Sequence, residues 1–116
     1  MFDVIETPAS HLIEARLAGV SFGNRQAMIA ELQPGDQLWL LREPNNSYDR
    51  NAIQVVNGEG ECVGYLPRDL AALMAPLLDH DGVVWPAEVL AINDCGQYGA
   101  NLGVTIGFMP PDSEHR

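Results

Sequence analysis

A polar segment between two apolar runs holds the residues of this chain that are best suited to chemistry. It runs from Glu43 to Val56, EPNNSYDRNAIQVV, and places an aromatic ring, a carboxylate and a guanidinium side by side at Tyr48, Asp49 and Arg50. The runs on either side are rich in branched and aromatic residues and predict buried strands. Because a polar loop held by two rigid strands often contains binding residues, we expect this loop to contact a ligand.

The chemistry of these side chains suits the end of a nucleic-acid strand. Asp49, as a carboxylate, can accept the proton of a sugar hydroxyl and would repel a phosphate in the same place. Tyr48 and Phe22 each offer a ring face for base stacking, which contributes about 1–3 kcal/mol per base. Arginine forks can hold one or two neighbouring phosphates, and the candidates are Arg25, Arg50 and Arg68.

The charge balance limits how much nucleic acid such a site can hold. The 116 residues include 16 acidic and 6 basic side chains, which gives a net charge of −10 and a pI near 4.4. Between Arg16 and Arg68, five arginines meet six carboxylates, so this segment has a net charge of −1 and the rest of the chain has −9. Binding a long duplex needs a broad basic face, which this composition excludes. We therefore expect any nucleic-acid contact to be short and local.

Length and composition indicate a single domain without a linker. No apolar run approaches the ~20 residues needed to cross a bilayer, and the first residues are acidic where a secretion signal would be basic, so we expect a cytoplasmic protein. Cys62 and Cys95 lack CxxC spacing, and the histidines are scattered at His11, His80 and His115. These patterns predict free thiols, no metal site and no cofactor.

Hydrophobic periodicity and turn residues predict the order of the elements. Asn57-Gly58 is expected to supply the positive φ angles of a tight hairpin. The predicted strands are 11–20, 37–42, 52–56, 61–66, 83–92 and 102–108, the predicted helices are 26–32 and 67–79, and the turn residues are 93–97.

The segment Pro67–Asp79 predicts an amphipathic helix. Pro67 suits the first helical position, whereas Pro76 in the interior predicts a kink or break near Ala75. The stripe expected to be buried consists of Leu70, Leu73, Met74, Leu77 and Leu78.

Together the elements predict an α+β domain that is mainly β. We expect a small, strongly curved sheet or a partly open barrel, OB-like or SH3-like, of about five to six strands with a capping helix after the central hairpin. The single domain 1–116 would have its core at about 12–108 and a flexible tail at 109–116.

Several candidate residues also have a plainer structural explanation. Asp49 and Asn51 can close a turn by bonding their own backbone. Tyr48 can be a core aromatic with a hydrated hydroxyl, and Phe22 can be a core residue instead of a stacking platform. The same residues are therefore compatible with a binding loop and with a purely structural turn.

Other side chains are interpreted from their place along the strands. Trp39, in the middle of a strand, is expected in the core. Arg42 and Glu43, adjacent at a strand end, are expected to point to opposite faces and into solvent. Trp85 can lie at the surface, and Pro86 beside it suggests an edge strand or a bulge.

An enzymatic function finds little support. The sequence has no histidine beside a nucleophile motif, no GxxxxGK phosphate loop and no paired histidine and carboxylate arrangement for a metal. We therefore predict a binding module.

Three segments in order resemble the HIRAN domain family. They are LAGVSFGNRQ, LQPGDQLWLLREPNNSYDRNAIQV and GECVGYLPRDLAALMAPLLDHDG, which begin at Leu17, Leu32 and Gly60. The resemblance covers about residues 12–108, and the chain is similar to a free-standing HIRAN protein of the bacterial type. It implies a fold related to oligonucleotide-binding barrels, and a module that binds single-stranded DNA ends by capturing a free 3′-hydroxyl.

The resemblance also implies roles for individual residues. Tyr48 and Asp49 match the family's aromatic-acid pair, with Asn46 just ahead of them, and Phe22 matches the aromatic residue in the loop after the first strand. Tyr65 and Arg68 match polar or basic positions at the start of the long helix. At Ser21 the end-binding members have an arginine, so this chain loses one phosphate contact. At Arg68 they have a lysine, so the positive charge is kept.

Two functions are therefore predicted as alternatives. The first is recognition of single-stranded DNA 3′ ends in DNA repair or replication, beside a helicase or nuclease encoded separately. The second is a protein-protein interaction module whose acidic surface meets a basic partner and which binds no DNA.

Overall fold

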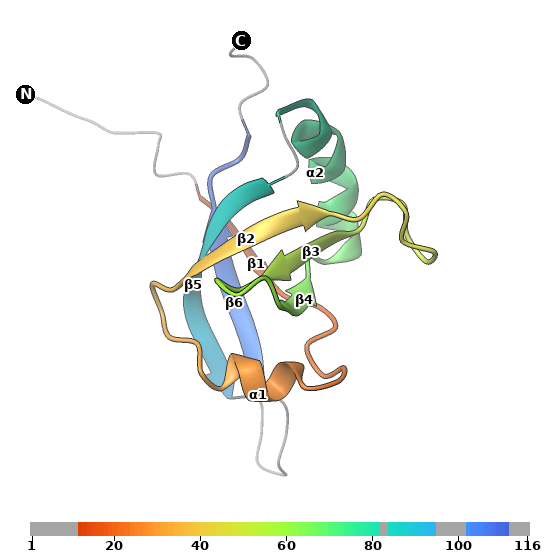
Figure 1. Cartoon of the computed structure of the whole chain (residues 1–116). Helices are drawn as coiled ribbons and strands as arrows, with labels where there is room; N and C mark the ends of the chain where they lie inside the picture. The colour runs from red at the N-terminus through yellow and green to blue at the C-terminus, as the bar shows by residue number, and fades with distance from the viewer. Residues whose placement is uncertain (1–11, 82–83, 95–101, 112–116) are drawn as a thin grey trace, which may run out of the picture.

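The computed structural model describes residues 12–81, 84–94 and 102–111 of the chain. This part of the chain forms a mainly β domain with one short and one long helix (Figure 1). The elements are β1 (Ile13–Arg16), α1 (Arg25–Ile29), β2 (Gln37–Arg42), β3 (Ile53–Val56), β4 (Cys62–Tyr65), α2 (Arg68–Asp81), β5 (Val84–Asp94) and β6 (Leu102–Phe108).

The strands form one antiparallel sheet that curls back on itself. Their order is β1-β6-β5-β2-β3-β4, so β1 and β4 are the two outer strands. Ala18, just after β1, exchanges two backbone hydrogen bonds with Tyr65 of β4, at 2.8 and 2.9 Å. This bridge closes the gap between the outer strands, and the prediction of a small barrel of five to six strands with a capping helix is confirmed.

The core fills the inside of this curled sheet. Leu38 and Leu40 of β2 are fully buried and alternate with half-buried neighbours, as expected for a strand with one face inward. Ile29 of α1 and Leu78 of α2 are also fully buried. Figure 1 shows α1 and α2 at opposite ends of the sheet, so each helix covers one end of the barrel.

The central hairpin is confirmed, but its predicted turn geometry is wrong. Neither Asn57 nor Gly58 has a positive φ; Gly60 does, at 80°. The side-chain oxygen of Asn57 accepts the N–H groups of Glu59 and Glu61, both at 3.0 Å. Asparagine therefore acts here by bonding its own loop, and glycine takes the left-handed position at the end of the turn.

Helix α2 differs from its prediction at two residues. Leu73, assigned to the buried stripe, is 71% exposed, whereas Met74 and Leu78 are buried. The helix is not broken near Ala75, because Arg68–Asp81 continues through Pro76. Proline removes a hydrogen bond to the carbonyl four residues earlier, and both Pro76 and Ala72 lie on the exposed face, where water can replace that bond.

The predicted edge strand is an inner strand. β5 lies between β6 and β2, and its irregular register falls between Val89 and Ala91, away from Pro86. Pro86 is tolerated because its part of β5 pairs with β2 alone; the register with β6 begins at Glu88. Trp39, expected in the core, is half-buried on the outer face, because Leu38 and Leu40 occupy the inward-facing positions of β2.

The ends of two predicted segments fall outside the described residues. The turn 93–97 begins inside β5, and its remainder is not described. Of the expected tail 109–116, the structure describes Met109–Pro111: Pro111 is buried, and the Met109 carbonyl accepts a 2.7 Å hydrogen bond from the Trp85 indole.

We expect Gly64→Ala to destabilise the barrel where it closes. A Cβ at Gly64 would lie 2.9 Å from the Ala18 carbonyl oxygen and 3.2 Å from Leu17 Cβ, and backbone cannot easily yield. Such overpacking costs about 1–3 kcal/mol, measured as the free energy of unfolding in urea. Gly58→Ala is the matched control, since no atom lies within 4 Å of its Cβ. Equal stability losses in the two variants would contradict this account.

Candidate nucleic-acid interface

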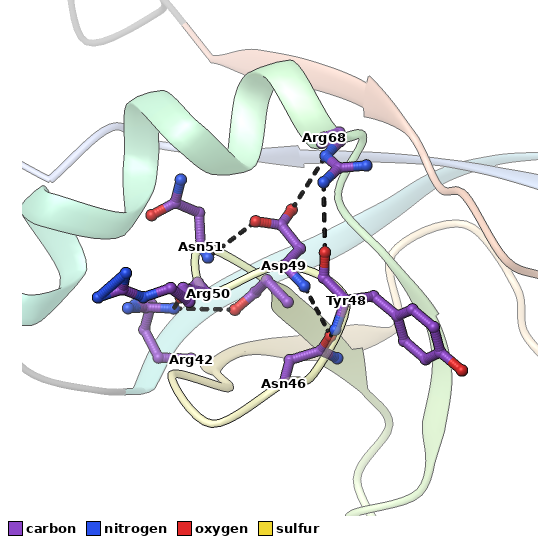
Figure 2. A network of polar contacts seen from close by, with 8 residues as sticks. Arg42, Asn46, Tyr48, Asp49, Arg50, Asn51 and Arg68 are labelled. Carbon is purple, nitrogen blue, oxygen red and sulfur yellow. Dashed lines mark hydrogen bonds and ion pairs between the residues drawn. The ribbon is translucent and has the colours of Figure 1, made fainter.

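The loop between β2 and β3 is ordered around the Asn46 side chain. Its Oδ1 accepts the N–H groups of Tyr48 and Asp49, at 2.8 and 3.0 Å (Figure 2). Its Nδ2 donates to Glu43 at 2.9 Å. The resemblance implied a ligand contact for Asn46. In the structure its amide is occupied within the loop, so it positions the two residues that follow.

One carboxylate oxygen of Asp49 accepts a hydrogen bond within the loop, and the other faces the start of α2. Oδ1 accepts the Asn51 N–H at 2.9 Å, so the predicted turn-closing role is present, and Asn51 contributes its backbone. Oδ2 lies 3.7 Å from Nε of Arg68, at the start of α2. The Asp49 side chain remains 21% exposed, and Oδ2 can therefore still accept a proton from a ligand.

Tyr48 is a free aromatic platform. Its side chain is 88% exposed, and Figure 2 shows the ring pointing away from the polar contacts of the loop. The alternative of a core aromatic is therefore wrong. The Tyr48 carbonyl accepts Arg68 Nη2 at 3.3 Å, which fixes the backbone beneath the ring.

Arg50 and Arg68 lie on different sides of the β2–β3 loop. Arg68 contacts both Tyr48 and Asp49, and its side chain is 76% exposed. The Arg50 side chain is exposed and points away from Tyr48 in Figure 2. Arg50 therefore does not join the cluster that the sequence predicted around Tyr48.

Arg42, predicted to be solvated, is a structural residue. Only 7% of its side chain is exposed, and it forms two bonds to the Asp79 carboxylate of α2, at 2.9 and 3.2 Å. Its Nη1 also donates to the carbonyls of Arg50 and Ala52, both at 3.0 Å. The prediction failed because Asp79 is 37 residues away along the chain.

Glu43, also predicted to be solvated, joins the loop to β4. Its Oε1 accepts the hydroxyl of Tyr65 and the amide of Asn46, both at 2.9 Å. Sequence analysis missed this role, and the spacing of three residues to Asn46 is the signal that could have indicated it. Burial, followed by the hydrogen bond to Glu43, raises the pKa of Tyr65 to about 12.

Arg25 and Phe22 extend this network beyond Tyr65. Arg25 Cζ lies 5.7 Å from the Phe22 ring centroid and 5.5 Å from the Tyr65 ring centroid, and Nη1 donates to the Gly19 carbonyl at 2.7 Å. Phe22 is 67% exposed, so the alternative of a core residue is wrong. Its ring and Arg25 line a surface hollow of about 410 Å³.

Eight of the nine predicted site residues therefore belong to one connected set of contacts within the described part of the chain. The chain of contacts runs from Phe22 through Arg25 and Tyr65 to Glu43, then through Asn46 to Tyr48, Asp49, Asn51 and Arg68. It combines the exposed rings of Tyr48 and Phe22 and the guanidinium groups of Arg25 and Arg68 with the Asp49 carboxylate, whose side chain is 21% exposed.

Three further features of the described residues concern metal ions, membranes and thiols. No three His, Cys, Asp or Glu side chains among them are placed to hold a metal ion. None of the described helices combines the length and apolar character needed to span a membrane. Cys62 is a free thiol whose pKa is raised mainly by burial, and Cys95 lies outside the described residues.

We expect Tyr65→Phe to reduce the loss of stability at high pH. The fold raises the pKa of Tyr65 from its ordinary value of 10.0 to about 12. The folded protein therefore favours the protonated phenol, and this contribution to stability is complete below pH 10 and is lost as the pH rises from 10 to 12. Wild-type free energy of unfolding should therefore fall more steeply than that of Tyr65→Phe over this range. Urea unfolding across the pH range measures it, and parallel curves would refute the assignment. Glu43→Gln should give an intermediate slope, since burial remains.

Comparison with known proteins places this chain in a family. The family description "HIRAN domain" matches residues 12–97. The Fanconi-associated nuclease 1 homolog of Arabidopsis thaliana is 42% identical over 80 residues, which cover 69% of this chain and 8% of that protein. The helicase-like transcription factor of Homo sapiens is 37% identical over 67 residues, which cover 58% of this chain and 6% of that protein. The chain thus matches less than a tenth of the length of these relatives.

Solved structures share the fold. The crystal structure of the HIRAN domain of human HLTF has a TM-score of 0.62 and 25% identity, covering 88% of this chain and 78% of that one. A Lactobacillus plantarum protein has a TM-score of 0.62 at 22% identity, covering 85% of this chain and 94% of its own, which supports the fold alone. The HLTF HIRAN domain in its DNA-bound conformation has a TM-score of 0.52 at 26% identity, covering 84% of this chain and 75% of that one. The match over residues 12–97 and the shared barrel show that this chain belongs to the HIRAN domain family.

Proposed function

We propose that this protein binds the 3′ ends of single-stranded DNA, in DNA repair or replication, and that the β2–β3 loop reads the terminal hydroxyl. The observation on which the proposal rests is the Asp49 carboxylate, whose side chain is 21% exposed and which lies 3.7 Å from the Arg68 guanidinium, next in the loop to the exposed ring of Tyr48. The DNA-bound structure of the HLTF HIRAN domain supports this class of ligand.

Asp49 supplies the selection for an end. A terminal hydroxyl donates a hydrogen bond to Oδ2, which faces Arg68 at 3.7 Å, and a charge-assisted bond of this kind is strong. A phosphate in the same place brings a second negative charge. Two like charges 4 Å apart repel by about 4 kcal/mol at an effective dielectric constant of about 20, and even a third of this is about a tenfold preference.

The rings and guanidinium groups supply the affinity. Tyr48 stacks on the terminal base, and Phe22, under the cationic Arg25, stacks on a further base at about 1–3 kcal/mol each. Arg68 and Arg25 hold the phosphates between them. With about two phosphate contacts, the dependence of affinity on salt should be shallow, at a logarithmic slope of about −1.4.

In this proposal the domain binds DNA and catalyses no reaction itself. The relatives are named as a nuclease and as helicase-like proteins, but the matched region covers at most 8% of those compared above. Any helicase or nuclease activity would belong to a separate partner that this domain brings to a strand end.

We expect Asp49→Asn to remove the preference for a 3′-hydroxyl. The amide oxygen of asparagine can still accept the Asn51 N–H, so the turn is retained while the negative charge is lost. The measurement is fluorescence anisotropy with short oligonucleotides. Wild-type protein should bind a strand ending in 3′-phosphate about tenfold more weakly than one ending in 3′-hydroxyl, and Asp49→Asn should bind the two strands nearly equally. Glu14→Gln, which neutralises an exposed carboxylate on β1, should leave the preference intact. Indistinguishable binding of the two ends by wild-type protein would remove the claim.

Arg25→Gln should weaken binding of both ends alike. Arg25 lies over Phe22 and Tyr65 and is proposed to hold a phosphate, whereas the Arg50 side chain points away from Tyr48. The logarithmic salt slope should therefore fall from about −1.4 to about −0.7 in Arg25→Gln. Arg50→Gln removes the same charge and is the matched control, with the wild-type slope expected. The same slope change in both variants would show a general effect of charge and no phosphate site at Arg25.

A further inference from the structure

We infer that the outer face of β2, β3 and β5 binds a segment of a partner protein in which lysine or arginine residues accompany apolar ones. This face combines an apolar strip with an adjoining acidic hollow. The strip shares no lining residue with the hollow of Phe22 and Arg25, whereas the acidic hollow adjoins it at Met28 and Glu61.

The apolar strip consists of Trp39, Leu41, Val56 and Val84. The sheet register pairs Trp39 with Val56 and Leu41 with Val84, so the four side chains are neighbours on one face. They line one surface hollow of about 280 Å³. Val84 is 50% exposed, Trp39 and Leu41 are half-buried, and Val56 is buried beneath them. A tryptophan that keeps exposed area inside an apolar depression is the kind of residue that anchors protein interfaces.

The acidic hollow adjoins the strip at the β3–β4 hairpin. Asn57 and Gly58 line both, so the two depressions are continuous. Four carboxylates line the acidic hollow, and none of them forms an ion pair with a described arginine; the two ion pairs in this part of the chain involve other residues. These carboxylates are Glu31, Asp36, Glu59 and Glu61.

The charges identify the chemistry of the partner. Four carboxylates beside an apolar strip complement a segment with basic residues at one side and apolar residues at the other, and complementary charges speed association and fix its register. A second copy of this chain is disfavoured, because each copy has a net charge of −10. DNA is repelled by the same carboxylates.

A synthetic peptide tests this inference. The probe is a short amphipathic peptide of leucine and lysine, titrated into ¹⁵N-labelled full-length protein at low salt while amide chemical shifts are recorded. We expect the shifts to concentrate on the strip and on the hairpin 57–61. Two analogues are compared: one with every leucine replaced by glutamine, and one with every lysine replaced by glutamate. Both should bind at least about fivefold more weakly, because each lacks one of the two complementary features.

Variants locate the contact. Val84→Asn should weaken the leucine-lysine peptide about fivefold, since it removes exposed apolar area from the strip. Leu73→Asn is the matched control, because Leu73 is also an exposed apolar residue, at 71%, but lies on α2 and does not line the strip. This variant should bind the peptide with the affinity of wild-type protein. Glu59→Gln with Glu61→Gln should weaken binding without unfolding the protein, because both residues are exposed.

Several outcomes would overturn the inference. They are shifts spread over carboxylates elsewhere, equal binding of the leucine-free peptide, no binding at low salt, or self-association of the protein that Val84→Asn abolishes. Peptide binding is also measured with a 3′-hydroxyl oligonucleotide present. Unchanged affinity would support two separate surfaces, and competition would contradict them. A failure of DNA binding alone leaves the peptide result standing.

Discussion

The nearly buried guanidinium of Arg42 is the interaction on which the binding loop depends. A charge removed from water must be paired and hydrogen-bonded, and Arg42 meets this requirement with the Asp79 carboxylate of α2 and the carbonyls of Arg50 and Ala52. One side chain therefore joins the end of β2, the returning arm of the loop and the last turns of the helix. The loop is fixed at its base, and its tip can present Tyr48 to solvent without losing its shape.

This fixed base explains how an acidic protein can have a small site for an anionic ligand. Asn46 and Glu43 hold the loop backbone before any ligand arrives, so little conformational entropy is lost on binding. In the proposed function, stacking then contributes without charge, and Arg25 and Arg68 would supply the few phosphate contacts needed. The same arrangement disfavours a long duplex, because a net charge of −10 repels any backbone that extends beyond the site. The overall charge thus restricts the ligand to a short segment.

Local patterns predicted most of the fold, and most of the candidate site residues lie in one set of contacts. Alternation identified the strands, the hairpin residues marked the central turn, and the exposed ring of Tyr48 lies in the loop where the polar cluster placed it. The errors concern contacts between distant segments. Arg42 was expected in solvent because its partner is 37 residues away, and Glu43 because Tyr65 is 22 residues away. Pro86 was assigned to an edge strand because sequence alone does not give the order of strands in the sheet.

The distribution of charge over the barrel follows from the same topology. The first residues of α1 and α2 bring Arg25 and Arg68 to one set of contacts, while the β3–β4 hairpin and the segment between α1 and β2 bring carboxylates together beside the strip. Arg25 and Glu61 line one hollow, so the two regions adjoin at α1. A negative region next to a short positive one repels nucleic acid that arrives in the wrong register, which adds selectivity without adding affinity. Acidity near the site is therefore compatible with end recognition, because an end has no continuing backbone to repel.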